Sequence, residues 1–391
     1  MPPMRVLSPV VSCLLLGLAG SAAAQRTWIV DQFGTGDFLD VPPAVAAAAP
    51  GDSILVRGVG PYDFSVTIDK ALALMGQVHG RFARGTLVIR GLPAGHTVTV
   101  KNFGHFDGDA LRCEVRDCAG HVVLRRVTLD GRDGTGSRAG LSVVGSRAVA
   151  VDDVFVQGNP AGLVRASNLV GQGTFTAHAA TLAGGAPLHG LDIEASSVAL
   201  TASCRGGDGS MSQPRGGDGL RAIGSRLRLT GCAATAGQSH TGPAAYALFV
   251  GAGDVELNAD PALTNHFAGL VETSTSTVHH RAFPIVGTGG WTQFNPLVVA
   301  TQGLPGSLVG VFAGIPTAPF AIPEGDLWLL PAPLVVVHVG AIPTGGLLRL
   351  TLPLPTNLPW GLTFGLQAAA VTLHGFVLSP PAFPIFEPGA V

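Results

Sequence analysis

The chain has 391 residues, of which 47% are hydrophobic, 12% charged and 6% aromatic. Glycine (55 residues) and proline (29 residues) are abundant but follow no collagen period, and this composition excludes a fibrous or intrinsically disordered chain. The formal net charge of −2 provides no electrostatic attraction for nucleic acid or an acidic membrane. The composition therefore indicates a folded chain that is long enough for about two or three domains.

The first 25 residues have the pattern of a secretory signal peptide. Arg5 supplies a positive charge, Val10–Leu18 is an apolar run, and Ala22–Ala24 provides the small residues that precede a cleavage site. No stretch of the chain reaches the about 18 uninterrupted apolar residues of a transmembrane helix. We therefore expect residues 1–25 to direct the protein out of the cell or to the cell surface. A lipoprotein signal ending at Cys13 is disfavoured, because much of the apolar run follows that cysteine.

Removal of the signal peptide would leave four cysteines, an even number that favours disulfides in an oxidising compartment. The simplest of the three possible pairings joins Cys113 to Cys118 and Cys204 to Cys232. A metal site is not indicated here, because the chain has no CxxC motif and no histidine at ligand spacing from these cysteines.

Short apolar segments recur through the middle of the chain. Their leucines are separated by 30, 22, 28, 29 and 28 residues and are Leu111, Leu141, Leu163, Leu191, Leu220 and Leu248. Each segment is followed by a second apolar alternation and by turns rich in Gly, Asn and Asp. Such repeats form stacked rungs, because one rung cannot bury its apolar face alone. The pattern predicts an all-β fold in which residues 26–280 form a right-handed parallel β-helix.

The N-terminal part of this region supports the same fold. Expected strands near Trp28–Asp31 and Ser53–Val56 flank a Gly-x-Gly-Asp-Phe turn and an alanine-rich segment, Val41–Ala49, which is the best helix candidate in the chain. This order resembles the opening of pectin-lyase-like β-helix proteins, notably the pectin methylesterase group. The resemblance covers about Trp28 to Gly76 and implies a helix that caps the open end of the coil. It is specific for the fold and implies little about activity, since one fold hosts many functions.

The catalytic segments of that superfamily do not recur in this chain. Methylesterases carry segments similar to QDTLY and DFIFG, and neither occurs here. Lyases of the fold hold Ca²⁺ with clustered Asp and use Arg or Lys as base, and hydrolases use clustered Asp with a His. The nearest residues in this chain, and hence the candidate catalytic residues, are Arg125, Arg126, Asp130, Asp152 and Asp153.

Four of these candidates are expected to form a charge ladder. Counting back from the glycine that ends each apolar segment places Arg125 level with Asp152, and the next residues, Arg126 and Asp153, level with each other. Equal positions on successive rungs lie about 4.8 Å apart, and a solvated ion pair there is worth under about 1 kcal/mol. The sharper alternative is a lyase site in which the aspartates hold Ca²⁺ and an arginine abstracts a proton.

A duplicated Gly-Gly-Asp-Gly sequence lies between Cys204 and Cys232. Its aspartates, Asp208 and Asp218, are candidate binding residues, because Gly/Asp repeats bind Ca²⁺ in β-rolls. That architecture needs a period of about nine residues over several turns. The chain has two copies ten residues apart, so a loop that joins two rungs is favoured. The histidines lack metal-ligand spacing, so we expect no metal and no cofactor, with Ca²⁺ required only by the lyase alternative.

The composition changes near the predicted end of the β-helix. Only four of the 110 residues from Ala282 onward are charged, and prolines separate short apolar segments. We expect a linker over residues 281–295 and a small antiparallel β-sandwich over residues 296–391. The segment from Phe364 to Ser379 also resembles a C-terminal β-module of secreted bacterial repeat proteins. Capping of the last rung and attachment to a surface are the roles left open.

Two functions follow from these features. The favoured one is a secreted, non-catalytic scaffold, a rigid rod that binds polysaccharide or cell-envelope material. The other is a polysaccharide lyase or hydrolase of the pectin-lyase-like fold. An enzyme would need several acidic groups and a base in one groove over Arg125–Asp153, whereas a scaffold would show isolated ion pairs.

Overall fold

A computed structural model describes residues 25–387, apart from positions 59, 78–80, 106–109, 133–137, 178–187, 211–214, 242–243, 261–262, 264, 290, 293, 323–324, 353, 355–357, 359 and 373–374. Residues 1–24 of the predicted signal peptide therefore lie outside the described residues. The chain divides into two compact units, of which one is Thr27–Arg281 and the other contains Ala282–Val391.

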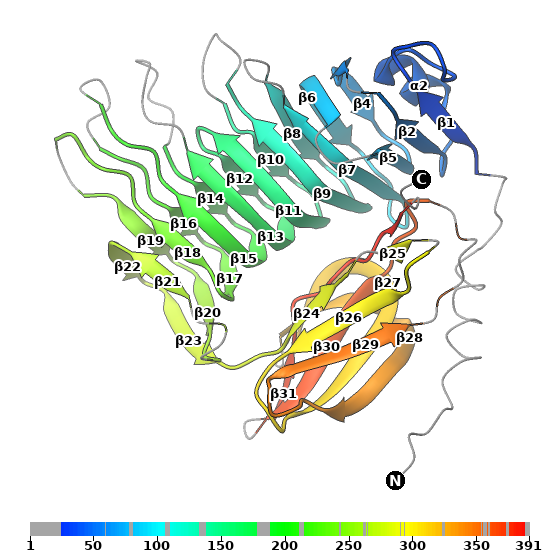
Figure 1. Cartoon of the computed structure of the whole chain (residues 1–391). Coiled ribbons are helices and arrows are strands. Elements are labelled where there is room, and N and C mark those ends of the chain that lie inside the picture. Colours follow the sequence, from blue (N-terminus) through cyan, green and yellow to red (C-terminus); the bar gives the residue numbers. More distant parts are fainter. Residues whose placement is uncertain are drawn as a thin grey trace. The chain divides into compact units, whose positions relative to one another are not determined.

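The unit Thr27–Arg281 is a parallel β-helix, so the predicted fold class is confirmed. Its strands pair in parallel with the strands of neighbouring rungs, and the described residues make about eight turns (Figure 1). One face, sheet A, contains β1 (Thr27–Val30), β2 (Ser53–Val56), β3 (Pro61–Asp63), β5 (Leu72–Gly76), β7 (Thr97–His105), β9 (His121–Asp130), β11 (Ala148–Gly158), β13 (Asn168–Ala177), β15 (Ser197–Arg205), β17 (Arg226–Leu229), β18 (Ala233–Thr235), β20 (Asp254–Asn258), β21 (His266–Ala268) and β23 (Thr277–Arg281).

The second face, sheet B, carries the predicted leucine repeat. It contains β4 (Val66–Ile68), β8 (Leu111–Arg116), β10 (Leu141–Val144), β12 (Gly162–Arg165), β14 (Leu191–Glu194), β16 (Leu220–Ile223), β19 (Tyr246–Gly251) and β22 (Leu270–Ser274). The strand β6 (Arg81–Arg90) is long enough to pair within both sheets.

The interior of the β-helix consists of columns of apolar side chains. The main inward column of sheet B contains Cys113, Leu141, Gly162, Leu191, Leu220 and Leu248. Four of the six predicted leucines occupy this column, whereas Leu111 and Leu163 do not. On this rung the inward position is Gly162, and Leu163 is the residue after it. A Cβ at Gly162 would lie only 2.8 Å from the Phe175 ring. The Phe175 ring therefore takes the space that a leucine side chain would fill.

A serine ladder forms the corner that leads from sheet B to sheet A. Its members are Ser146 (0% exposed), Ser167 (3%), Ser196 (7%) and Ser225 (3%). Each of the first three donates its backbone N–H to the hydroxyl of the next serine along the stack, over 3.0 to 3.2 Å. Each hydroxyl in turn donates to the carbonyl two residues earlier in its own rung. The ladder thus gives buried serine N–H groups an acceptor, and it adds a second hydrogen bond to carbonyls that already accept a backbone N–H from the neighbouring rung.

All four cysteines outside the signal are buried free thiols, so the predicted Cys113–Cys118 and Cys204–Cys232 disulfides are wrong for this structure. Cys113 and Cys204 belong to the apolar core of the β-helix. The Cys118 thiol lies next to the serine ladder and donates to the Arg116 carbonyl at 3.3 Å, whereas the Cys232 thiol donates to the Leu200 carbonyl at 3.2 Å. Burial raises the pKa of Cys113 to about 12 and that of Cys232 to about 11. These thiols act as small apolar groups with weak donors.

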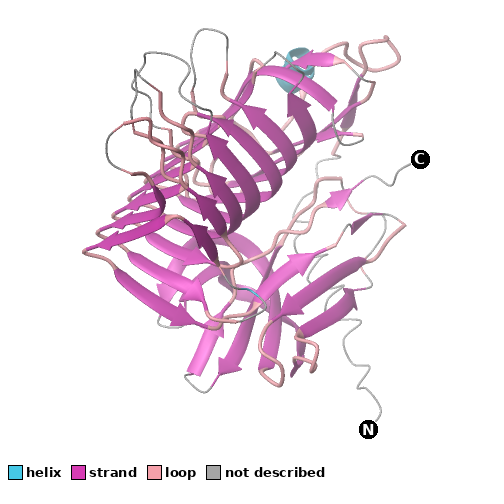
Figure 2. Ribbon diagram, turned by 60° about the vertical axis from the view of Figure 1, so that its left-hand side comes forward, coloured by secondary structure: helices cyan, strands magenta, loops and turns pink. Residues whose placement is uncertain are grey.

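One short helix covers the first rungs. The helix α2 (Val41–Ala47) ends two residues before the predicted end, and Asp40 caps it by accepting the Val41 N–H at 2.8 Å. Its buried residues Val41, Ala44 and Val45 join the core of the β-helix. The predicted capping helix is therefore present at the end of the stack where β1 and β2 lie (Figures 1 and 2). No helix among the described residues has the length and hydrophobicity to cross a membrane.

The second unit consists of two antiparallel sheets and one short parallel pair of strands. A three-stranded sheet is formed by β24 (Ile285–Thr288), β26 (Leu297–Gln302) and β29 (Leu347–Leu352), and a four-stranded sheet by β28 (Gly325–Ala341), β27 (Leu308–Ile322), β30 (Gly365–Thr372) and β31 (Gly375–Leu378). The short strands β25 (Trp291–Thr292) and β32 (Phe386–Glu387) pair with each other. The predicted linker, residues 281–295, contains β24 and β25, so this unit begins before residue 296. The β-sandwich stays a prediction.

Candidate functional site

The predicted ladder at Arg125 and Asp152 exists. The two residues are register partners on β9 and β11, and the Arg125 Nε lies 2.9 Å from the Asp152 Oδ2. Gln172, one rung further, donates its amide to the other carboxylate oxygen at 2.6 Å. The pairing is confirmed, and the neighbour of Asp152 on the next rung is an amide rather than a second acid.

Arg126 and Asp153 occupy the bend that divides each of these long strands. Their φ angles are 49° and 54°, in the left-handed region, and this bend interrupts the in–out alternation of the strand. Asp130 lies beyond the bend and accepts hydrogen bonds from the Arg132 amide, Nε and Nη2. Of the five predicted catalytic residues, Arg125 and Asp152 thus pair with each other, Asp130 pairs with Arg132, and Arg126 and Asp153 lie at bends.

The two copies of the Gly-Gly-Asp-Gly sequence lie in loops that stack on each other. Gly217 donates its N–H to the Gly207 carbonyl at 2.8 Å, which joins the two copies directly. Asp208 accepts the Gln238 N–H at 2.8 Å, whereas Asp218 is buried in a different environment. Among the described residues, no three His, Cys, Asp or Glu side chains gather as metal ligands would.

Asp218 belongs to a cluster of charged and aromatic residues at the start of three successive sheet B strands. We call this set the sheet B cluster, and its members are His189, Asp192, Arg215, Asp218, Arg221 and Tyr246. His189 and Asp218 each lie two residues before the strands β14 and β16, and Tyr246 begins β19. Asp192 and Arg221 are register partners on the outer side of β14 and β16. The rung repeat thus brings together residues that are 28 or 29 positions apart.

The Asp218 carboxylate is the centre of the cluster. Its side chain is 2% exposed, and its Oδ1 accepts the Tyr246 N–H at 2.8 Å and lies 3.3 Å from the Arg215 Nη2. Its Oδ2 lies 3.4 Å from the His189 Nδ1. Through this ion pair and backbone hydrogen bond, the Asp218 carboxylate orients the groups around it.

His189 is held in one tautomer by the backbone. Its Nδ1 accepts the Asp218 N–H at 3.0 Å, so the neutral ring carries its proton on Nε2. Burial lowers the pKa of His189, and the nearby Arg221 and Arg215 lower it further, against the opposing effect of Asp218 and Asp192. The imidazole is therefore a neutral donor at pH 7.

The exposed part of the cluster consists of arginines whose acidic partners are buried. The Arg221 Nη1 lies 2.8 Å from the Asp192 Oδ1, with side-chain exposures of 30% and 4%. The Arg215 side chain is 44% exposed, and its guanidinium lies 5.8 Å from the centre of the Tyr246 ring. A hydrogen bond to Glu272 is the main cause that raises the pKa of the Tyr246 hydroxyl.

This arrangement is suited to recognition rather than to acid–base chemistry. Both buried aspartates form ion pairs with arginines, and the His189 Nδ1 already accepts a hydrogen bond from the Asp218 N–H. The surface presents two guanidinium groups, each held by a buried aspartate, and that of Arg215 also lies beside the Tyr246 ring. Such groups suit a ligand rich in hydroxyl or carboxylate oxygens.

The neutral state of His189 predicts how the stability of the folded chain depends on pH. The pKa of His189 is lower in the folded chain than in the unfolded chain. As the pH drops below about 6.5, the imidazole is therefore protonated in the unfolded chain before it is protonated in the folded chain, and the free energy of unfolding falls. The loss from this residue is at most about 1.4 kcal/mol per pH unit. Urea unfolding of the full chain at pH 8 and at about pH 5 should show a smaller loss in His189→Gln than in the unsubstituted protein. Equal losses of stability in the two proteins would contradict this prediction.

Known proteins provide no direct guide to this site. No family model matches the chain, and no curated protein matches it. The function therefore has to be argued from the β-helix and from the sheet B cluster.

Proposed function

We propose that this protein is a secreted, non-catalytic β-helix scaffold that binds a polysaccharide or cell-envelope glycan on the outer side of sheet B. The observation that carries the proposal is the pair of surface arginines, Arg215 and Arg221, each oriented by an aspartate whose side chain is at most 4% exposed. Guanidinium groups held in place lose little conformational entropy when they bind. The stacked strands supply a rigid, repetitive face of the kind that an extended polymer can follow.

The lyase and hydrolase alternatives have less support. They require several acids and a base on one substrate, whereas Arg125 and Asp152 pair with each other and Asp130 pairs with Arg132, which is not one of the predicted residues. The signal-like N-terminus supports export.

The test is affinity gel electrophoresis of the full chain in neutral and acidic polysaccharides, with and without Ca²⁺. We expect one glycan to retard the protein, and Arg215→Ala/Arg221→Ala to weaken the retardation at least about tenfold. The matched control is Arg90→Ala/Arg116→Ala, a neighbouring arginine pair on earlier rungs of the same sheet, which should bind normally. Circular dichroism should show that both double variants fold.

Two results would count against the proposal. Equal weakening by the two arginine pairs would show that general positive charge, rather than the sheet B cluster, holds the glycan. Release of new polysaccharide ends that stops in Asp152→Ala/Asp153→Ala would establish the enzyme alternative instead.

A further inference from the structure

The four-stranded sheet of the second unit has two apolar faces. One face packs inward, with Val309, Val311, Leu366 and Ala368 in the core of the unit. The opposite face carries exposed apolar side chains, among them Leu308 (49% exposed), Val339 (61%), Val371 (39%) and Phe376 (57%). An antiparallel sheet normally has one polar face. Packing within the unit therefore does not account for the apolar side chains on the second face.

The ends of β27 and β28 continue past the sheet as a curled hairpin that closes over this face. The pairing continues to the hairpin end, where Phe320 lies opposite Leu327 and Ile322 opposite Gly325. Gln367 on β30 holds the hairpin in place, because its Oε1 accepts the Trp328 N–H at 3.0 Å and its Nε2 donates to the Asp326 carbonyl at 2.7 Å. The same Nε2 donates its second hydrogen to the Ser379 carbonyl at 2.8 Å.

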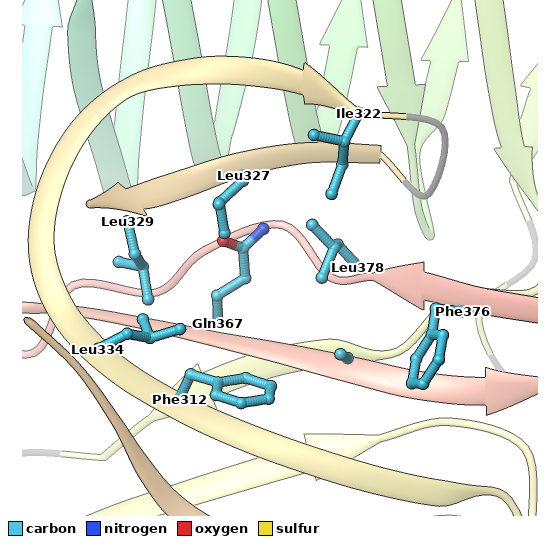
Figure 3. A pocket seen from close by; sticks show the side chains of 9 residues that line it. Phe312, Ile322, Leu327, Leu329, Leu334, Gln367, Phe376 and Leu378 are labelled. Carbon is cyan, nitrogen blue, oxygen red and sulfur yellow. The ribbon is translucent and has the colours of Figure 1, made fainter. Parts of the chain in front are cut away.

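A pocket of about 300 Å³ lies between the hairpin and the sheet. Figure 3 shows Ile322, Leu327 and Leu329 from the hairpin on one side of it and Phe312 and Phe376 from the sheet on the other. The described residues that line it are Phe312, Ile322, Leu327, Leu329, Leu334, Gln367, Ala369, Phe376 and Leu378.

The pocket has a buried floor and an open rim. Leu329 (0% exposed) and Gln367 (1%) lie at the floor, whereas Ile322 (39%) and Phe376 (57%) lie at the rim. Among the described residues that line the pocket, the only polar one is Gln367, and both of its amide hydrogens are used within the protein. Since none of these described residues is charged, a sugar or an ion would lose its hydration against them without compensation.

We propose that this pocket binds the single hydrocarbon chain of a small, uncharged amphiphile. A volume of 300 Å³ holds about ten groups of the size of a water molecule, which corresponds to a chain of about ten carbons. The chain would lie between the hairpin and the sheet, with its head group in water at the rim formed by Ile322 and Phe376. Two long chains of a bilayer lipid exceed this volume. This site is separate from the sheet B cluster and does not depend on the glycan proposal.

The experiment uses the full chain, the fluorescent neutral probe N-phenyl-1-naphthylamine, and 1-alkanols of six to fourteen carbons as competitors. We expect saturable 1:1 binding of the probe. Each added methylene should improve displacement about fourfold until the chain reaches about ten carbons, after which the gain should stop.

Two substitutions of the same kind localise the site. Ala369→Phe fills the pocket and should weaken probe binding at least about tenfold, whereas Ala341→Phe, at an exposed position outside the lining, should leave it unchanged. Leu334→Ala enlarges the pocket and should move the chain-length limit to longer alkanols, which keeps the test valid if Ala369→Phe fails to fold.

Other outcomes would overturn the proposal. Probe binding that is not saturable, or that is equal in folded Ala369→Phe and Ala341→Phe, would show adsorption to the exposed apolar face. Sedimentation with phosphatidylcholine vesicles that Ala369→Phe abolishes, without displacement of the probe by alkanols, would identify a bilayer rather than a single chain as the ligand.

Discussion

Replacement of Gly171 by alanine should lower the free energy of unfolding of the β-helix by about 3–5 kcal/mol. Gly171 lies in β13 with a φ of +132°, and a Cβ at this position would lie 1.7 Å from the carbonyl oxygen of its register partner, Val151. The backbone conformation alone costs an L-residue about 1–3 kcal/mol. The clash is with backbone rather than with a flexible side chain, so β11 and β13 must separate and lose sheet hydrogen bonds of about 0.5–1.5 kcal/mol each.

The control for this prediction is Gly104→Ala. Gly104 lies in β7, and its Cβ would be 3.7 Å from the Thr128 Cβ, an ordinary contact. We expect Gly104→Ala to cost no more than about 0.5 kcal/mol. Urea unfolding followed by circular dichroism measures both variants, and hydrogen exchange of β11 and β13 peptides should locate the defect. Similar stabilities of the two variants would mean that the rungs can separate at Gly171 without loss.

The β-helix could be predicted because each rung must bury the same inward positions. That requirement produces the leucine spacing, and it places Leu141, Leu191, Leu220 and Leu248 in one column. The spacing of the leucines could not show that the column contains Gly162 in place of a leucine. The glycine is required by the ring of Phe175, which comes from sheet A. The disulfides were predicted from an even number of cysteines, and that number does not distinguish paired cysteines from thiols that fill a core.

Of the sheet B cluster, the sequence analysis identifies only Asp218 as a candidate binding residue, although more of it can be predicted. The repeat that aligns Leu191 with Leu220 also places Asp192 level with Arg221 and His189 level with Asp218. The charges near Arg125 and Asp153 are denser in the sequence and therefore give the stronger signal. Arg215 could not have been predicted, because it comes from a loop between rungs and meets Asp218 only in the folded chain.

The serine ladder has a similar signal in the sequence, a serine that follows a glycine or alanine after four successive sheet B strands. These small residues, Gly145, Ala166, Ala195 and Gly224, have φ angles of 62°, 47°, 49° and 57°. The left-handed turn that they make directs the next side chain inward. Cys118 follows Asp117, which has a φ of 52°, and so occupies the equivalent place one rung earlier. A polar residue at this place is selected by the backbone that it must satisfy.

Ser196→Ala should therefore destabilise the β-helix by about 1–3 kcal/mol. The Ser196 hydroxyl accepts the Ser167 N–H at 3.1 Å and donates to the Glu194 carbonyl at 2.7 Å. Alanine leaves the buried Ser167 N–H without this acceptor, whereas the Glu194 carbonyl keeps the hydrogen bond from the Ala166 N–H at 3.0 Å. Ser196→Cys should cost clearly less, because the thiol of Cys118 already donates to the carbonyl two residues earlier, at 3.3 Å, in the equivalent place.

Urea unfolding of Ser196→Ala, Ser196→Cys and Ser142→Ala separates the hydrogen bonds of the ladder from the volume of the side chain. Ser142 lies on the outer side of β10, so its substitution should change stability by less than about 0.5 kcal/mol. If Ser196→Ala were as stable as Ser142→Ala, the Ser167 N–H would have to find another acceptor, and the ladder would be a consequence of the fold rather than a cause of its stability. A loss of stability in Ser196→Ala alone would instead show that side-chain hydrogen bonds stabilise this corner. The flanking sheets differ, because backbone hydrogen bonds stabilise them.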